Sequence, residues 1–103
     1  MEEPVIESDT VAVRHEPKAH RFVVRLNNQI AYLSYEKTED DALDYAHVYV
    51  PPDYRNRGIA SQLTERALEY ARKEGITVIP SCSFVEYYLT RHPEYEDIVS
   101  RHA

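Results

Sequence analysis

The sequence predicts one α/β (α+β) domain, in which an antiparallel β-meander precedes a strand–helix–strand–helix unit on a mixed sheet. Three observations support this fold class. Strand-like runs fill the first half, an amphipathic helical period follows Gly58, and a short apolar run follows Gly75. The 103 residues have room for a single domain over 1–103, and a hydrophobic content of 43% is enough for one core. The acidic residues 1–9 are expected to form a flexible lead-in.

The meander is predicted from runs of β-branched and aromatic residues separated by turn signals. Asn27 and Asn28 suit a tight hairpin turn, because asparagine tolerates the left-handed conformation that such turns require. Pro51 and Pro52 end the last strand, because proline cannot donate a ladder hydrogen bond. The expected strands cover 10–14, 21–26, 30–36 and 42–50.

The second half is predicted to be a helix, a short strand and a second helix. From Ile59 the apolar residues recur about every four positions, and Gly75 provides a left-handed helix end. A buried strand is expected over 76–80 and a helix over 83–92, which Pro93 ends. Because a crossover helix joins the strands at 42–50 and 76–80, we expect these two strands to be parallel.

Composition limits the function classes. A net charge of −6 argues against a nucleic-acid-binding protein and is compatible with a cationic partner such as an amine, although acidity also serves solubility. The single cysteine excludes an intrachain disulfide and favours a reducing compartment. We find neither a membrane-spanning apolar run nor a secretory signal, and we therefore expect a cytoplasmic protein.

The junction RNRGIA places one of only two glycines between a strand and a helix. Unpaired N–H groups and the helix dipole make such a junction an anion site, and Gly58 would let a phosphate approach the backbone closely. Ala60 keeps the next position small, and Arg55 and Arg57 could add charge-assisted contacts. The alternative is a plain turn whose arginines point into solvent.

The surrounding run, HVYVPPDYRNRGIASQLTERALEYAR, resembles the acetyl-CoA-binding motif of the GNAT superfamily of N-acetyltransferases. That motif reads V-x-P-x-x-(R/Q)-x-x-G-x-(G/A) and precedes a helix. Here Val50, Pro52, Arg55, Gly58 and Ala60 match it. The resemblance implies a GNAT-type sheet, a CoA pyrophosphate held by backbone N–H groups of 55–60, and a pantetheine between strands 42–50 and 76–80. The implied cofactor-binding residues are Val48, Tyr49, Val50, Arg55, Asn56, Arg57, Gly58, Ile59, Ala60, Ser81 and Cys82.

The resemblance covers nearly the whole chain and is strongest with a small single-domain subfamily. Fuller relatives carry two helices between their first two strands, and those helices help to build the acceptor pocket. This chain lacks them, so the acceptor stays open between a protein lysine, an N-terminus, a polyamine and a small metabolite. The sequence does not indicate the oligomeric state.

Three residues are candidates for the chemistry of acetyl transfer. Cys82, between a strand and a helix, could accept the acetyl group, line its pocket, or be an inert core residue. Tyr88 occupies the place of the superfamily's thiolate-protonating tyrosine, although His92 and Pro93 stand where Gly-Phe is usual. Its neighbour Tyr87, on a different face, is an alternative for this role, and Tyr88 could instead pack in the core.

His47 is expected to share a strand face with Tyr45 and Tyr49, where it could deprotonate the amine or bond a backbone carbonyl. The histidines and the cysteine show no spacing typical of a metal site. The sequence therefore predicts an acetyl-CoA-dependent N-acetyltransferase. The alternatives are a CoA- or acyl-CoA-binding module that acts through a partner with little turnover, and a regulatory interaction domain.

Overall fold

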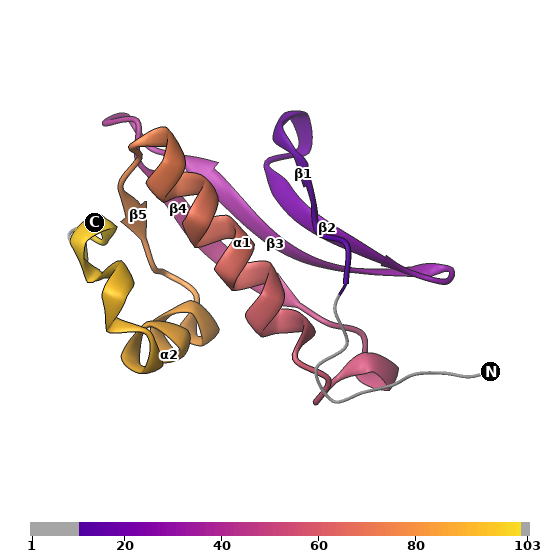
Figure 1. The fold of residues 1–103 in the computed structure, drawn as a ribbon. Coiled ribbons are helices and arrows are strands. Elements are labelled where there is room, and N and C mark those ends of the chain that lie inside the picture. The colour runs from indigo at the N-terminus through magenta and orange to yellow at the C-terminus, as the bar shows by residue number, and fades with distance from the viewer. Residues whose placement is uncertain (1–10, 102–103) are drawn as a thin grey trace.

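The computed structural model describes residues 11–101, which form a five-stranded mixed sheet with two helices (Figure 1). The strands lie in chain order, the first four are antiparallel, and β5 is parallel to β4. The strands are β1 (Arg14–Glu16), β2 (Arg21–Leu26), β3 (Gln29–Lys37), β4 (Leu43–Tyr49) and β5 (Val78–Ile79). The helices are α1 (Ile59–Glu74) and α2 (Ser83–Arg91), with short 3-10 turns at Pro17–Ala19, Pro52–Tyr54 and Pro93–Ile98.

The predicted meander and the parallel crossover are confirmed, but two strand boundaries were wrong. The first strand is Arg14–Glu16 and not 10–14, because a 3-10 turn and a left-handed His20 set its pairing with β2. Residues 11–13 instead contact α1, where Gln62 accepts a hydrogen bond from the Val11 N–H at 2.9 Å. Residue 10 and the predicted lead-in lie outside the described residues.

The strand expected over 76–80 shrinks to Val78–Ile79. Its residues pair with Leu43 and Asp44 of β4, and a turn then begins in which the Ser81 N–H donates to the Ile79 carbonyl. The Cys82 N–H makes one more bond, to the Tyr45 carbonyl at 3.0 Å. In the described part of the chain β4 therefore extends past its short partner, and residues 46–49 lie beyond the β4–β5 ladder.

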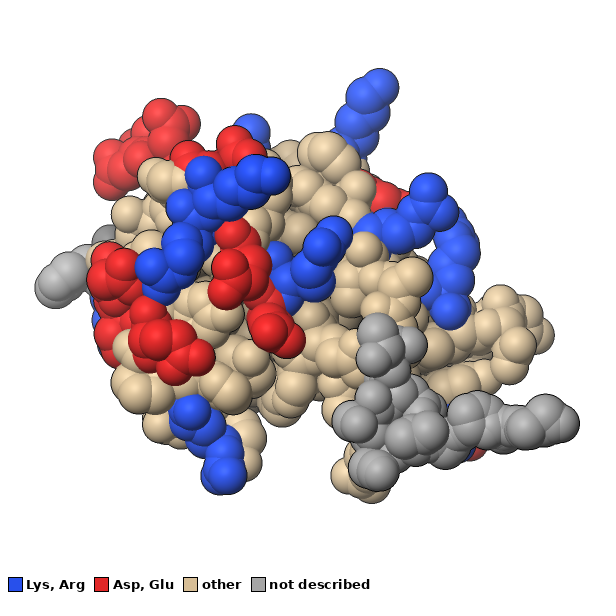
Figure 2. All heavy atoms as spheres, viewed as in Figure 1, with Lys and Arg blue, Asp and Glu red and all other residues tan. Residues whose placement is uncertain are grey.

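Helix α1 crosses one face of the sheet and forms the centre of the core (Figure 1). Leu63, Ala67 and Ala71 are fully buried, as the apolar period predicted. Tyr45 reaches up from β4 and donates its hydroxyl to the Ala67 carbonyl at 2.5 Å. On the visible outer surface acidic and basic side chains are interleaved (Figure 2). One ion pair of the described chain joins Arg72 to Asp97 at 2.9 Å.

A β-bulge in β4 changes which side chains share a face. Ser34 of β3 opposes His47, but the next residue, Tyr35, opposes Tyr45, so Ala46 is extra. Tyr45 consequently points toward α1, whereas His47 points away from it. The expectation that these two residues share a face was wrong, because simple alternation fails across a bulge.

Candidate functional site

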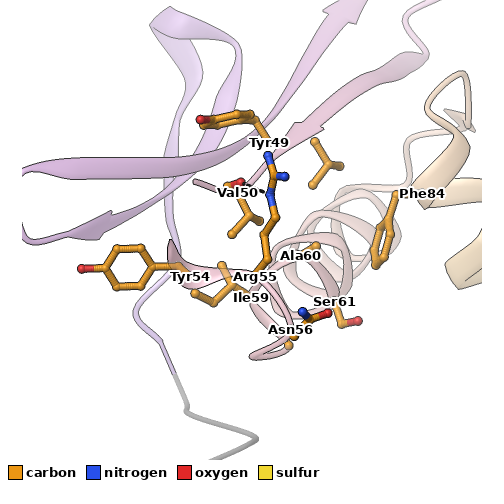
Figure 3. A pocket seen from close by; sticks show the side chains of 11 residues that line it. Tyr49, Val50, Tyr54, Arg55, Asn56, Ile59, Ala60, Ser61 and Phe84 are labelled. Atoms are coloured by element: carbon orange, nitrogen blue, oxygen red, sulfur yellow. Dashed lines mark hydrogen bonds between the residues drawn. The ribbon is translucent and has the colours of Figure 1, made fainter. Parts of the chain in front are cut away.

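A cleft of about 450 Å³ opens where β4 ends and α1 begins (Figure 3). Its walls come from the end of β4, the turn that follows, the first turn of α1 and one residue of α2. The lining residues are Val48, Tyr49, Val50, Tyr54, Arg55, Asn56, Gly58, Ile59, Ala60, Ser61 and Phe84. The cleft therefore surrounds the junction that the sequence predicted to be an anion site.

Among the described residues, no side chain caps the beginning of α1. Gly58 is the N-cap residue with φ +78°, a left-handed conformation that favours glycine. The cap makes no side-chain hydrogen bond, and the first turn carries no acidic residue. The first N–H groups of α1 therefore lack the side-chain cap that usually satisfies such donors, and the helix dipole there favours an anion.

Arg55 connects the two sides of the junction. Its Nε donates to the carbonyl of Val50, the residue after β4, at 2.8 Å, and its side chain extends from the turn toward the end of that strand (Figure 3). This bond uses one of the five guanidinium N–H groups, which leaves the terminal amino groups for other acceptors. Arg57 is exposed and lies over the Tyr54 ring, with 5.5 Å between its guanidinium carbon and the ring centroid.

Most of the residues predicted to bind the cofactor line this cleft together. Three of them, Arg57, Ser81 and Cys82, are not among its lining residues. The sequence analysis missed Tyr54, Ser61 and Phe84. Tyr54 and Ser61 lie inside the motif run, which was a usable signal, but Phe84 belongs to α2 and reaches the cleft only through the tertiary fold.

Cys82 lies beside the end of β5, as the N-cap residue of α2, and is half-buried. Its bond to the Tyr45 carbonyl attaches α2 to β4 at the position where the β4–β5 ladder ends. Phe84, two residues further on, faces the cleft from the side opposite to Tyr54 (Figure 3). The start of α2 therefore contributes one wall of the cleft and is also attached to β4.

Tyr88 lies one helical turn beyond Phe84 on the same side of α2. It is 6% exposed and stacks on His92, with 4.0 Å between the ring centroids. Burial, followed by the nearby carboxylates of Glu65, Glu94 and Glu69, raises the pKa of Tyr88 to about 12. Its phenol therefore stays protonated at neutral pH. Tyr87, in contrast, is 55% exposed and contacts Arg91.

His47 is exposed on the sheet face away from α1, next to Tyr32 at 5.9 Å between ring centroids. Among residues 11–101 no hydrogen bond or ring contact joins any two of His47, Cys82 and Tyr88. Cys82 precedes α2 as its N-cap residue, Tyr88 lies within that helix, and His47 is on the opposite face of β4 from the cleft-lining Val48. Within the described chain the three candidates therefore do not form a hydrogen-bonded triad.

Comparison with known proteins shows the family to which this chain belongs. The sequence profile of the family described as GCN5-related N-acetyl-transferase matches residues 21–98. The chain belongs to this family. Protein NATD1 of Gallus gallus is 34% identical over 81% of this chain and 77% of its own length, and Protein NATD1 of Homo sapiens is 33% identical over 81% and 75%.

A solved structure shows the same fold. The solution structure of a GCN5-like putative N-acetyltransferase from Staphylococcus aureus superposes with a TM-score of 0.70 at 21% identity, covering 90% of this chain and 91% of that one. The family and fold resemblance predicted from the motif is therefore confirmed. In this GCN5-related chain, β1 and β2 are joined only by the 3-10 turn at Pro17–Ala19, so no helices stand between them.

Two further findings concern the described residues alone. No helix within 11–101 is both long and apolar enough to cross a membrane. In the same part of the chain, His, Cys, Asp and Glu side chains form no group of three or more that could hold a metal ion.

Proposed function

We propose that the cleft binds acetyl-CoA, with the pyrophosphate at the beginning of α1. The uncapped first turn offers N–H donors, Gly58 keeps the approach free of a Cβ, and the terminal amino groups of Arg55 add charge-assisted contacts. The absence of an acidic residue from that first turn supports the same assignment. This combination in one cleft is the observation that carries the proposal.

The pantetheine arm is proposed to continue along β4. Residues 46–49 of β4 extend past the β4–β5 ladder, so an extended chain could lie beside them as an additional strand. Val48, Val50 and Phe84 supply apolar walls along this path. The thioester would then lie beside β4 near the start of α2, next to the point where the Cys82 N–H is bonded to the Tyr45 carbonyl.

The reaction proposed there is transfer of the acetyl group to an amine. Acetyl-CoA supplies the activated thioester. His47, exposed across β4, would remove a proton from the incoming ammonium. Cys82 is assigned a lining role, because direct attack by an amine held in place needs no enzyme nucleophile.

Tyr88 would stabilise the departing thiolate by donating a hydrogen bond. With its pKa raised to about 12, the phenol holds its proton more tightly than a thiol with an ordinary pKa of about 8.5 does. Complete proton transfer to the thiolate would therefore be uphill, whereas a charge-assisted hydrogen bond needs no transfer.

The test is calorimetry with acetyl-CoA, followed by mass spectrometry of a mixed amine panel incubated with protein and acetyl-CoA. We expect binding and at least one acetylated amine. A second candidate, a CoA-binding module that acts through a partner, is favoured by the short β1–β2 connection, which leaves no helices to enclose an acceptor. Binding without any acetylated product would support the module, and absence of binding would contradict both.

A further inference from the structure

One face of α2 carries a row of three side chains that begins in the cleft. Phe84 lines the cleft on the wall opposite to Tyr54 (Figure 3). Tyr87 follows on α2 with 6.0 Å between the two ring centroids, and the Arg91 guanidinium lies over the Tyr87 ring at 5.8 Å. Residues three and four positions apart are neighbours on a helix surface, so the three side chains share a face. The row therefore leads from the cleft to the end of α2.

The outer part of this row is open to solvent. Tyr87 is 55% exposed and is one of two exposed large hydrophobic residues in the described chain. Arg91 is also exposed, and its Nη1 donates to the Tyr87 hydroxyl at 3.4 Å. The other charged residue of α2, Glu86, is bound to Arg101 at 2.8 Å. Within residues 11–101 Arg91 therefore has no carboxylate partner, and it lies beside an exposed aromatic ring.

The proposed cofactor has an end for which the cleft leaves no place. In the proposed function the pyrophosphate binds at the beginning of α1 and the pantetheine arm follows β4, and together they occupy the cleft of about 450 Å³. The adenosine is attached to the other side of the pyrophosphate and carries a phosphate on its 3′-oxygen. It must therefore leave the cleft at the rim, where an aromatic ring can stack on the base and a cation can bind the phosphate.

We propose, on the basis of the proposed function, that this row binds the adenosine 3′-phosphate end of acetyl-CoA. The adenine would stack on the exposed Tyr87 ring next to Phe84, and Arg91 would bind the 3′-phosphate. Phe84 and Arg91 lie about 10 Å apart along the helix axis, at about 1.5 Å per residue, which is a length that one nucleotide can span. The row would thus make the protein selective for donors that carry the 3′-phosphate.

A second tyrosine–arginine pair lies on the opposite wall of the cleft, but it suits this end less well. The Tyr54 hydroxyl accepts a hydrogen bond from Asn27 at 2.7 Å, and Arg57 lies over the Tyr54 ring at 5.5 Å. Tyr54 is half-buried, and within residues 11–101 it has no ring contact with another aromatic side chain. Arg57 directly precedes Gly58, so it lies next to the proposed pyrophosphate. On α2, in contrast, two rings are in contact and the arginine lies beyond them.

The exposure of the row sets the size of the expected effect. The chain has a net charge of −6, so an anion at its surface depends on a local cation such as Arg91. A contact between exposed charges contributes little in water and is screened by salt, and we therefore expect the 3′-phosphate to improve affinity about threefold at low ionic strength. Stacking of a base on an aromatic side chain is the larger contribution, so the loss of the Tyr87 ring should cost at least about fivefold.

The first test is calorimetry with CoA and 3′-dephospho-CoA at low ionic strength. Wild type should bind CoA about threefold more tightly than 3′-dephospho-CoA. Arg91→Gln should abolish this preference by weakening CoA alone, whereas Tyr87→Ala should weaken both ligands at least about fivefold. Arg14→Gln removes an exposed arginine from β1, at the edge of the sheet away from β5, and is the matched control that should change neither affinity. All three side chains are exposed, so circular dichroism should show little change in Tm.

A second measurement uses a ligand without the thioester arm. Adenosine 3′,5′-bisphosphate should shift the amide NMR signals of Phe84, Tyr87 and Arg91. Four results would overturn the inference while CoA binding stands: equal affinities of wild type for the two ligands, a preference that persists in Arg91→Gln, a preference that Arg57→Gln abolishes instead, or NMR shifts confined to other residues. If wild type binds neither CoA nor 3′-dephospho-CoA, the proposed function fails and the inference fails with it.

Discussion

The two glycines provide a matched test of the proposed phosphate site. Both have left-handed backbones, with φ +78° at Gly58 and +70° at Gly75. An L-residue in that conformation costs about 1–2 kcal/mol, which lowers Tm by roughly 4–8 °C for each kcal/mol in a domain of this size. A Cβ at Gly75 would meet no atom within 4 Å, so strain is its only cost. Gly75→Ala therefore measures the backbone strain alone, and Gly58→Ala should cost at least as much.

CoA affinity should separate the two variants. Gly58 lines the cleft at the start of α1, where the pyrophosphate is proposed to bind, so we expect an added methyl group to reduce affinity at least about tenfold, which is about 1.4 kcal/mol. Gly75→Ala lies at the other end of α1 and should bind CoA within about twofold. The assays are calorimetry below the Tm of both variants and thermal unfolding by circular dichroism. A folded Gly58→Ala that binds CoA as the wild type does would refute the anion-site reasoning, and equal losses in both variants would assign the effect to stability.

Three other perturbations test the candidate residues and one titrating group. Cys82→Ala should reduce turnover only modestly if the thiol lines the pocket; an acetyl adduct on the intact protein, forming and decaying at the turnover rate, would instead establish a covalent role. Tyr88→Phe should lower kcat and leave CoA affinity within a few-fold, since its hydrogen bond acts on the leaving thiolate; if Tyr87→Phe gives that result and Tyr88→Phe does not, the assignment on α2 is wrong. Burial, followed by the nearby charge of Arg66, lowers the pKa of His15 below its ordinary 6.5. As the pH falls through 6.5, the unfolded chain therefore binds a proton at His15 before the folded protein does. The stability from neutral His15 is complete above pH 6.5 and is lost below it, and Tm should fall more steeply between about pH 7 and about pH 5 in wild type than in His15→Phe. Equal slopes would contradict this.

The fold was largely predictable because local signals agreed with one another. The apolar period from Ile59, the Gly75 end and the two prolines after β4 each have a local physical cause, and the structure confirms all three. The junction at Gly58 was also visible, because a scarce glycine between a strand and a helix indicates a left-handed backbone or a close approach to it.

What the sequence could not show depends on pairing between segments. The bulge at Ala46 arises from the register of β4 against β3, and nothing in the run YAHVY distinguishes it from simple alternation. Phe84 reaches the cleft because the Cys82 N–H is bonded to β4, a contact between residues far apart in the chain. Local patterns therefore could not predict the sheet face toward which His47 points, or the cleft wall that Phe84 forms.

The segment after α2 contributes to holding the cleft wall. Two residue pairs join β5 to β4, so α2, which carries Phe84, depends on further contacts. Besides the Cys82 bond and the core residues of α2, these contacts come from the segment after the helix. The Ser100 N–H donates to the Val78 carbonyl at 2.9 Å, and Arg101 contacts Glu86 of α2 at 2.8 Å. Through these contacts with β5 and α2, the C-terminal segment supports the cleft wall that Phe84 forms.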